Sequence, residues 1–170
     1  MAPKTDKETQ FTRLIADYKE VVAKVCYLYM SANASFDDLY QEVLINLWQG
    51  LDSFRGEAKI STWIYRTALN TCITWHRRNN RHATNVALDQ LVAEPPDTGS
   101  DAAVQMEQYR QLYVMISKLN PVDKALITLW LDDKPYDEIA LITGLSQSNV
   151  GVRLHRIKDK LTKMAETENY

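Results

Sequence analysis

Apolar residues recur along this chain at steps of three and four residues, and this spacing constrains the fold more than any other feature. Near the N-terminus it runs through Phe11, Leu14, Tyr18, Val22 and Val25. Such a period places the side chains on one face of an α-helix. The 170 residues include only five glycines and five prolines, which favours long helices over a turn-rich β fold. The sequence therefore predicts an all-α protein.

Capping residues and first-turn residues predict where further helices start. Ser35 is a suitable N-cap for a second helix, and the two aspartates that follow Phe36 suit its N-terminal dipole. Ser61 is predicted to cap a third helix. Asn120 is a good N-cap and Pro121 fits the first helical position. The predicted inner faces are Leu39, Val43, Leu44, Leu47, Trp48 and Leu51 for the second helix, and Ile64, Ala68, Cys72 and Trp75 for the third.

Residues 83–100 lack helical periodicity and include the run Glu-Pro-Pro-Asp-Thr-Gly-Ser, which is typical of a linker. The net charge is only −2, but charge is unevenly distributed. Residues 59–82 and 146–163 each carry five Lys/Arg, whereas residues 83–109 carry five carboxylates and no Lys/Arg. The sequence predicts two small helical domains, 1–82 and 101–170, joined by a flexible acidic linker.

The segment 136–161 has the pattern of a helix-turn-helix. Ala140, Gly144 and Val150 supply a small residue in the first helix, a turn residue that tolerates positive φ, and an apolar residue facing back. Ser146 is predicted to cap the second helix. The buried stripe of that helix is expected to be Val150, Leu154, Ile157 and Leu161, with Gln147, Ser148, Asn149, Gly151, Arg153, His155 and Arg156 facing outward or flanking.

This outward face has groups that suit DNA. Gln, Asn and Arg near the helix start can hydrogen-bond base edges, and Arg153, Arg156, Lys158 and Lys160 suit phosphates. A merely solvated basic helix remains the alternative. Gly151 either permits close backbone approach to DNA or has no role.

A second basic segment, from Phe54 to Arg81, interleaves aromatic rings with cations. Aromatic rings stack on unpaired bases while cations follow the backbone, which suits single-stranded nucleic acid. Burial in the core is the alternative, and it is favoured for Tyr65 and Trp75. Trp63 lies off the predicted inner stripe and stays open between the two interpretations.

Several classes of protein are disfavoured. Cys26 and Cys72 lack CxxC spacing, so we expect buried, reduced thiols of a cytoplasmic protein. No apolar run is long enough to span a bilayer, so no membrane insertion is expected. His76, His82 and His155 have no metal-ligand spacing, so no metal, cofactor or catalytic residue is predicted.

Three segments together resemble the extracytoplasmic-function (ECF) class of bacterial RNA polymerase sigma factors, in the sigma-70 superfamily. DDLYQEVLINLW (37–48) is similar to the family's polymerase-binding helix. SFRGEAKISTWIYRTALN (53–70) resembles the segment that handles the melted minus-10 element. LNPVDKALITLWLDDKPYDEIALITGLSQSNVGVRLHRIKDKL (119–161) resembles the domain that reads the minus-35 element. The order and spacing match over nearly the whole chain.

The resemblance implies a transcription initiation factor without catalytic activity of its own, which binds core RNA polymerase, directs it to promoters and helps melt the minus-10 element. It implies promoter DNA, duplex and melted, as a partner, and an anti-sigma factor as inhibitor. The implied polymerase-binding residues are Asp38, Gln41, Glu42, Asn46 and Trp48. The implied minus-10 residues are Phe54, Arg55, Lys59, Trp63, Arg66, Asn70, Arg77, Arg78 and Arg81. The implied minus-35 residues are Gln147, Ser148, Asn149, Arg153, His155 and Arg156.

The chain departs from the family pattern at Ile60, Thr74, Asn149 and Gly151, the last two in the segment that resembles the minus-35 domain. A stand-alone helix-turn-helix regulator is the main alternative, but such proteins usually dimerise on symmetric sites, which two unlike basic modules fit poorly. A nuclease is disfavoured, because the sequence shows no metal-ligand spacing and no pairing of a nucleophile with a base. A pure protein-interaction bundle would not need the basic segments.

Overall fold

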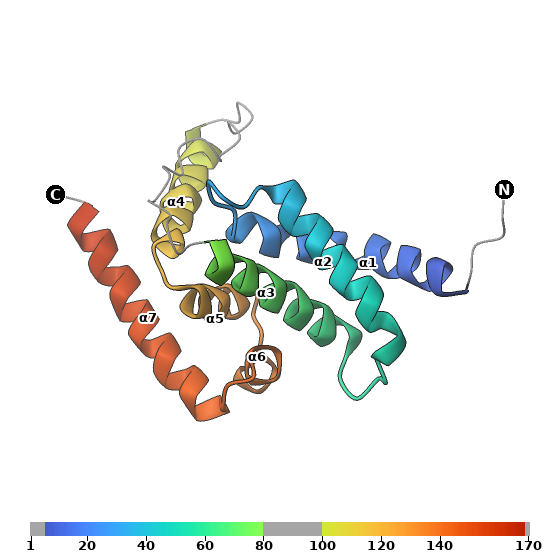
Figure 1. Ribbon diagram of the computed structural model, residues 1–170. Helices are drawn as coiled ribbons and strands as arrows, with labels where there is room; N and C mark the ends of the chain where they lie inside the picture. Colours follow the sequence, from blue (N-terminus) through green and yellow to red (C-terminus); the bar gives the residue numbers. More distant parts are fainter. Residues whose placement is uncertain (1–5, 80–99, 169–170) are drawn as a thin grey trace. The chain divides into compact units, whose positions relative to one another are not determined.

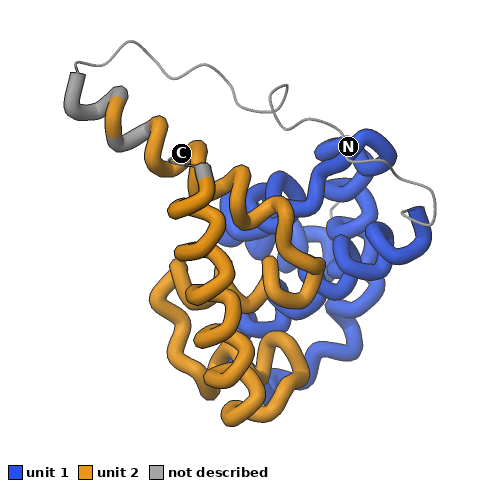
Figure 2. Tube along the Cα trace, turned by 90° about the vertical axis from the view of Figure 1, so that its left-hand side faces the viewer, with its two compact units in different colours: residues 1–84 blue, residues 85–170 orange. Residues whose placement is uncertain are grey.

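The computed structural model describes residues 6–79 and 100–168, and within them every regular element is a helix (Figure 1). The chain divides into two compact units, Met1–Thr84 and Asn85–Tyr170 (Figure 2). The all-α prediction and the division into two helical domains are confirmed. The predicted linker 83–100 falls almost wholly outside the described residues, as do Arg81 and His82, so the predicted domain limits stay predictions.

The first unit is built from three helices, α1 (Asp6–Leu28), α2 (Phe36–Gly50) and α3 (Ile60–Asn79), each of which packs on the other two. A short 3-10 turn, η1 (Leu51–Ser53), follows α2. The predicted Ser35 cap is present, because its hydroxyl accepts a hydrogen bond from the Asp38 N–H at 3.1 Å. The core of this unit consists of Val22, Val25 and Cys26 from α1, Leu39, Val43 and Leu47 from α2, and Ile64, Ala68 and Cys72 from α3.

The predicted N-cap of α3 at Ser61 is wrong. The helix begins at Ile60, and the carbonyl of Lys59 accepts the first hydrogen bond from the Trp63 N–H at 3.1 Å. Ser61 therefore lies inside the first turn, where a hydroxyl is not needed as a cap. Tyr65 is buried as predicted, whereas Trp75 is only half-buried and donates its indole N–H to the Asn33 carbonyl at 3.5 Å.

The two cysteines meet between α1 and α3. Both thiols are free and fully buried, as expected. A hydrogen bond with Cys26 and burial together raise the pKa of the Cys72 thiol. A buried thiol with a raised pKa has little reactive thiolate, so these residues contribute to packing.

The second unit contains α4 (Ser100–Ser117), α5 (Pro121–Leu131), α6 (Tyr136–Thr143) and α7 (Gln147–Glu168). Asn120 caps α5 as predicted, accepting from the Asp123 N–H at 2.9 Å, with Pro121 in the first turn. The turn into α6 includes Asp133, which has φ of 57°. The core of the unit is formed by Leu126, Leu129, Ile139, Ile142, Val150, Leu154 and Ile157.

Candidate nucleic-acid interfaces

The turn between α6 and α7 has the geometry of a helix-turn-helix. Gly144 ends α6 in the left-handed region with φ of 75°, and its N–H donates to the Ala140 carbonyl. Ser146 caps α7, accepting from the Asn149 N–H at 3.2 Å. Val150 and Leu154 are fully buried behind the turn. The positive φ of Gly144, the Ser146 cap and the burial of Val150 and Leu154 were all predicted.

Replacing Gly144 by alanine is expected to lower the free energy of unfolding of this unit by about 1–2 kcal/mol, because a Cβ is disfavoured at positive φ. Nothing lies within 4 Å of the position that a Cβ would take, so the effect is conformational. Gly144→Asn is the matched variant, since asparagine tolerates this conformation better. Urea unfolding, with hydrogen exchange to locate the change in α6 and α7, measures both. Equal losses for the two variants would contradict this account.

The outward face of α7 is polar at its start. Among the predicted minus-35 residues, five are exposed and lie opposite or beside the buried stripe: Gln147, Ser148, Asn149, His155 and Arg156. Val152, which the sequence analysis did not select, is 52% exposed in the middle of the same face. Its signal was present in the sequence, because Val152 is out of step with the apolar stripe of Val150 and Leu154.

Arg153 differs from its neighbours. Its guanidinium donates to Asp123 Oδ1 on α5 from Nη2 at 2.8 Å and from Nε at 3.2 Å. The two side chains are 30% and 18% exposed, respectively. This ion pair ties α7 to the start of α5 and engages the charge that the sequence analysis assigned to DNA. The sequence did not indicate this pairing, because the partner lies thirty residues away.

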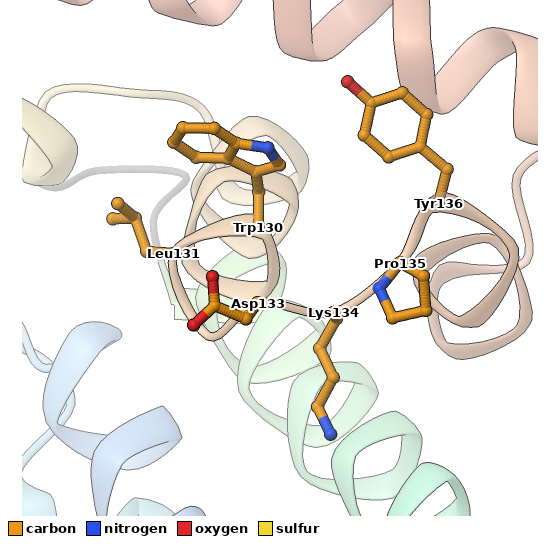
Figure 3. Close-up of a pocket in the computed structure, with 6 residues that line it drawn as sticks. All are labelled: Trp130, Leu131, Asp133, Lys134, Pro135 and Tyr136. Carbon is orange, nitrogen blue, oxygen red and sulfur yellow. The ribbon is translucent and has the colours of Figure 1, made fainter.

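The packing of Tyr136 explains why position 151 is a glycine. A Cβ built at this position would lie 3.3 Å from Cε2 of Tyr136, which is tighter than most side-chain contacts. Tyr136 begins α6, and its ring points toward α7 (Figure 3). The tyrosine ring thus occupies the space that a longer side chain at position 151 would need.

A hollow of about 380 Å³ lies at the turn between α5 and α6, lined by Trp130, Leu131, Asp133, Lys134, Pro135 and Tyr136 (Figure 3). Lys134 pairs with Glu138 at 3.4 Å, and the Lys158 ammonium lies 4.1 Å from the centroid of a Trp130 ring. Lys158, predicted to contact phosphates, therefore also covers an aromatic side chain. The lining of the hollow combines apolar side chains with one carboxylate and one ammonium group.

In the first unit, α3 presents a long exposed face. Trp63, Arg66, Asn70, Thr74 and Arg77 follow one another at steps of three or four residues, which places them on one side of a helix. That side is opposite the buried Ile64, Ala68 and Cys72. Arg66, Asn70, Arg77 and the adjacent Arg78 are exposed.

An aromatic pair stands at the start of this face. The rings of Phe54 and Trp63 have centroids 5.2 Å apart, and both are half-buried. Gly50 lies beneath the indole, where a Cβ would be 3.1 Å from Trp63 Cζ2. The loop between them, which includes Arg55 and Lys59, is exposed. Trp63, which the sequence analysis left open, is therefore a surface ring supported from below.

The predicted polymerase-binding residues of α2 separate into two groups. Asp38 and Gln41 are exposed and Glu42 is half-buried. In contrast, the Asn46 amide donates to the Thr71 hydroxyl on α3 at 2.9 Å, and the half-buried Trp48 contacts α1. The contacts on Trp48 are an edge-on contact with Phe11, centroids 5.2 Å apart, and the Lys7 ammonium 4.4 Å above the ring.

Ile45, which was not among the predicted site residues, is 48% exposed and lies one turn after Gln41 on the outer face of α2. The predicted inner face of this helix leaves Ile45 out, but no role was predicted for it. The signal was its position, two residues from the buried Val43 and Leu47 and therefore on the opposite side.

Comparisons with known proteins match both units. The Sigma-70 region 2 family model matches residues 14–82, and the Sigma-70 region 4 model matches residues 109–161. The sigma factor YlaC of Bacillus subtilis (strain 168) is 33% identical over 140 residues, 77% of this chain and 80% of YlaC. The ECF sigma-E factor of Escherichia coli (strain K12) is 29% identical over 161 residues, 89% and 84% of the two chains. The chain belongs to the ECF sigma factors. This sigma factor is thus a promoter-specific transcription initiation factor, whose regions bind core polymerase and promoter DNA.

Solved structures share the fold of this ECF sigma factor. The sigma factor RpoE of Bartonella quintana, solved with the anti-sigma factor NepR, matches with a TM-score of 0.72 over 92% of this chain and 97% of RpoE, at 16% identity. CnrH, solved with the cytosolic domain of CnrY, matches with a TM-score of 0.64 over 92% and 88% of the chains, at 21% identity. Among the described residues, no helix is long and apolar enough to cross a membrane.

Proposed function

We propose that this ECF sigma factor divides promoter recognition between its two units, with α3 of residues 1–82 at the melted minus-10 element and α7 of residues 101–170 at the minus-35 element. The observation that carries the proposal is the exposed face of α3, which has an aromatic pair at one end and arginines at the other. Residues 83–100 connect the units, and the factor acts in the cytoplasm, where its polymerase is.

The face of α3 suits a single strand. Phe54 and Trp63 offer rings on which an extruded base can stack, and Arg55 and Lys59 lie in the exposed loop beside them. Arg66 and Asn70 follow on the same face. The backbone beyond would be held by Arg77 and Arg78, and by Arg81 outside the described residues.

The face of α7 suits duplex DNA. A recognition helix in the major groove contacts base edges with residues of its N-terminal part, which here are Gln147, Ser148 and Asn149. His155 and Arg156, one turn or more further on, reach the phosphates or the next bases. We assign Arg153 a positioning role, because its guanidinium is bound by Asp123.

We propose that α2 docks on core polymerase through Asp38, Gln41 and Glu42, with Ile45 as an apolar centre among them. Interfaces place apolar residues at the centre and polar ones around them. Asn46 and Trp48 would support this surface from within, since both side chains contact neighbouring helices. An anti-sigma factor is proposed as the inhibitor. The support is that two proteins of the same fold were solved with such partners or with a cytosolic domain.

Transcription by sigma-free core polymerase, with and without the protein, tests the proposal on DNA upstream of the protein's own gene. We expect a discrete start that depends on the protein, and footprinting then locates both promoter elements. Co-purification with core polymerase is read from the same mixture. A protein that neither binds core nor starts RNA would contradict the proposal and favour a stand-alone regulator.

Trp63→Ala is expected to reduce open complexes by about 5- to 150-fold, because stacking of one base on an aromatic ring contributes about 1–3 kcal/mol. Permanganate reactivity of melted thymines measures the effect. Phe36→Ala is the matched control, since Phe36 and Tyr40 also form a ring pair, 5.4 Å apart, in the same unit but on α2. Equal defects in the two variants would contradict the role of Trp63.

A further inference from the structure

The centre of the outward face of α7 is apolar. The buried residues Val150, Leu154 and Ile157 define the inner direction of the helix, and at 100° per residue Val152 points almost directly away from them. Its side chain is 52% exposed. A helix residue has its neighbours three and four positions away, so Val152 is surrounded by Ser148, Asn149, His155 and Arg156, all of them exposed.

A single exposed valine needs no explanation on an ordinary surface. Here it lies in the middle of a row of side chains that are otherwise polar or cationic. This row ends at an acidic residue. Asp159 is the next residue on the outward face, with its carboxylate 3.6 Å from Nε2 of His155. Because a carboxylate is repelled by phosphates, the part of the helix that approaches DNA lies before it. Val152 is central in that part.

Two contacts prevent the neighbours of Val152 in sequence from reaching bases. Position 151, next to Val152, has no side chain and is packed against Tyr136. Arg153, on the other side, is bound to Asp123. The residues that flank Val152 in sequence are thus unable to extend over it, and the valine methyl groups stand clear at the surface.

We propose that Val152 is a specificity-determining residue, whose methyl groups contact the C5-methyl of one thymine in the minus-35 element. The thymine methyl is the only apolar group that base pairs present in the major groove, and apolar side chains recognise it. The polar residues around Val152 hydrogen-bond neighbouring base edges or phosphates. This inference rests on the proposed function, because it needs α7 in the major groove of a promoter.

A methyl scan tests the inference with the full chain bound to core polymerase on the promoter found by transcription. Each thymine of the minus-35 element, on both strands, is replaced in turn by deoxyuridine, which lacks only the methyl group. At one position we expect wild-type holoenzyme to bind about three- to fivefold more weakly, the effect of burying one methyl group. Val152→Ala holoenzyme should be weakened similarly on thymine DNA and be indifferent to deoxyuridine at that position.

Two control variants accompany the scan. Val152→Thr keeps a methyl group, so it should keep the sensitivity. Leu141→Ala removes another apolar side chain of the helix-turn-helix, 61% exposed on α6, and should leave the pattern of the scan unchanged. Alanine is favourable in an exposed helix position, so Val152→Ala is expected to fold.

The outcomes separate the inference from the proposed function. A protein-dependent start with no thymine whose methyl effect disappears in Val152→Ala overturns the inference alone. Sensitivity that disappears equally in Leu141→Ala also overturns it. Absence of any protein-dependent start overturns the proposed function and this inference with it.

Discussion

Replacing Leu154 by alanine is expected to lower the free energy of unfolding of the second unit by about 2–5 kcal/mol. Leu154 is fully buried between α7 and the helices beneath it, and truncating such a residue removes apolar contacts and leaves a cavity. Urea unfolding of the full chain measures the loss. Hydrogen exchange of the amides of α5, α6 and α7 shows whether it is confined to this unit.

Val152→Ala is the matched control for Leu154→Ala. Both residues are aliphatic and lie two positions apart on α7, but Val152 is 52% exposed. Its truncation should change the free energy of unfolding by no more than about 0.5 kcal/mol, as is usual for surface substitutions. A comparable loss in the two variants would show that the register of α7 differs from the one described.

Two arginines of α7 are expected to respond very differently to charge reversal. Arg153→Glu brings a second carboxylate against Asp123 and removes two hydrogen bonds, so we expect the unit to lose about 2–4 kcal/mol of stability. The figure is below that for a fully buried pair, because these side chains are 30% and 18% exposed and water screens them. Arg156→Glu, at an exposed position, should leave stability nearly unchanged and weaken promoter binding.

The comparison is made by measuring urea unfolding and holoenzyme binding to promoter DNA at several salt concentrations. Arg156→Ala should lower the salt dependence of binding by about one counterion, which is the signature of a lost phosphate contact. Asp123→Ala should abolish most of the further effect of Arg153→Ala, because the pair acts as a unit. Additive effects of those two alanine substitutions would contradict the ion pair.

The local features of the fold followed from short stretches of sequence. The Ser35, Asn120 and Ser146 caps and the Gly144 turn each depend on residues within four positions of one another. Backbone geometry relates such neighbours directly, so sequence patterns predict them. The misplaced N-cap of α3 is the exception, and it differs by two residues, because the carbonyl of Lys59 closes the first turn without help from Ser61.

Only part of the candidate site could be predicted from the sequence. The sequence placed Trp63, Arg66, Asn70 and Arg77 on one helix, and their three- and four-residue spacing gave them a common face. Ile45 and Val152 were missed, because the candidate site residues were chosen for polar, charged or aromatic side chains, although neither residue lies on a predicted inner stripe. Whether an aliphatic side chain is buried depends on what packs against it, and periodicity shows this only after the buried stripe is known.

By itself the sequence determined that this protein is two helical units, with a helix-turn-helix in the second and cationic helices in both. These properties are local, being set by periodicity, caps and turn residues. Only the tertiary structure decided which polar side chains are engaged. Arg153 is bound by Asp123 and Asn46 by Thr71, across thirty and twenty-five residues. The space beside Gly151 is likewise occupied by Tyr136. Such pairs form because packing brings distant segments together, and packing therefore decides which side chains of α7 stay free to meet DNA.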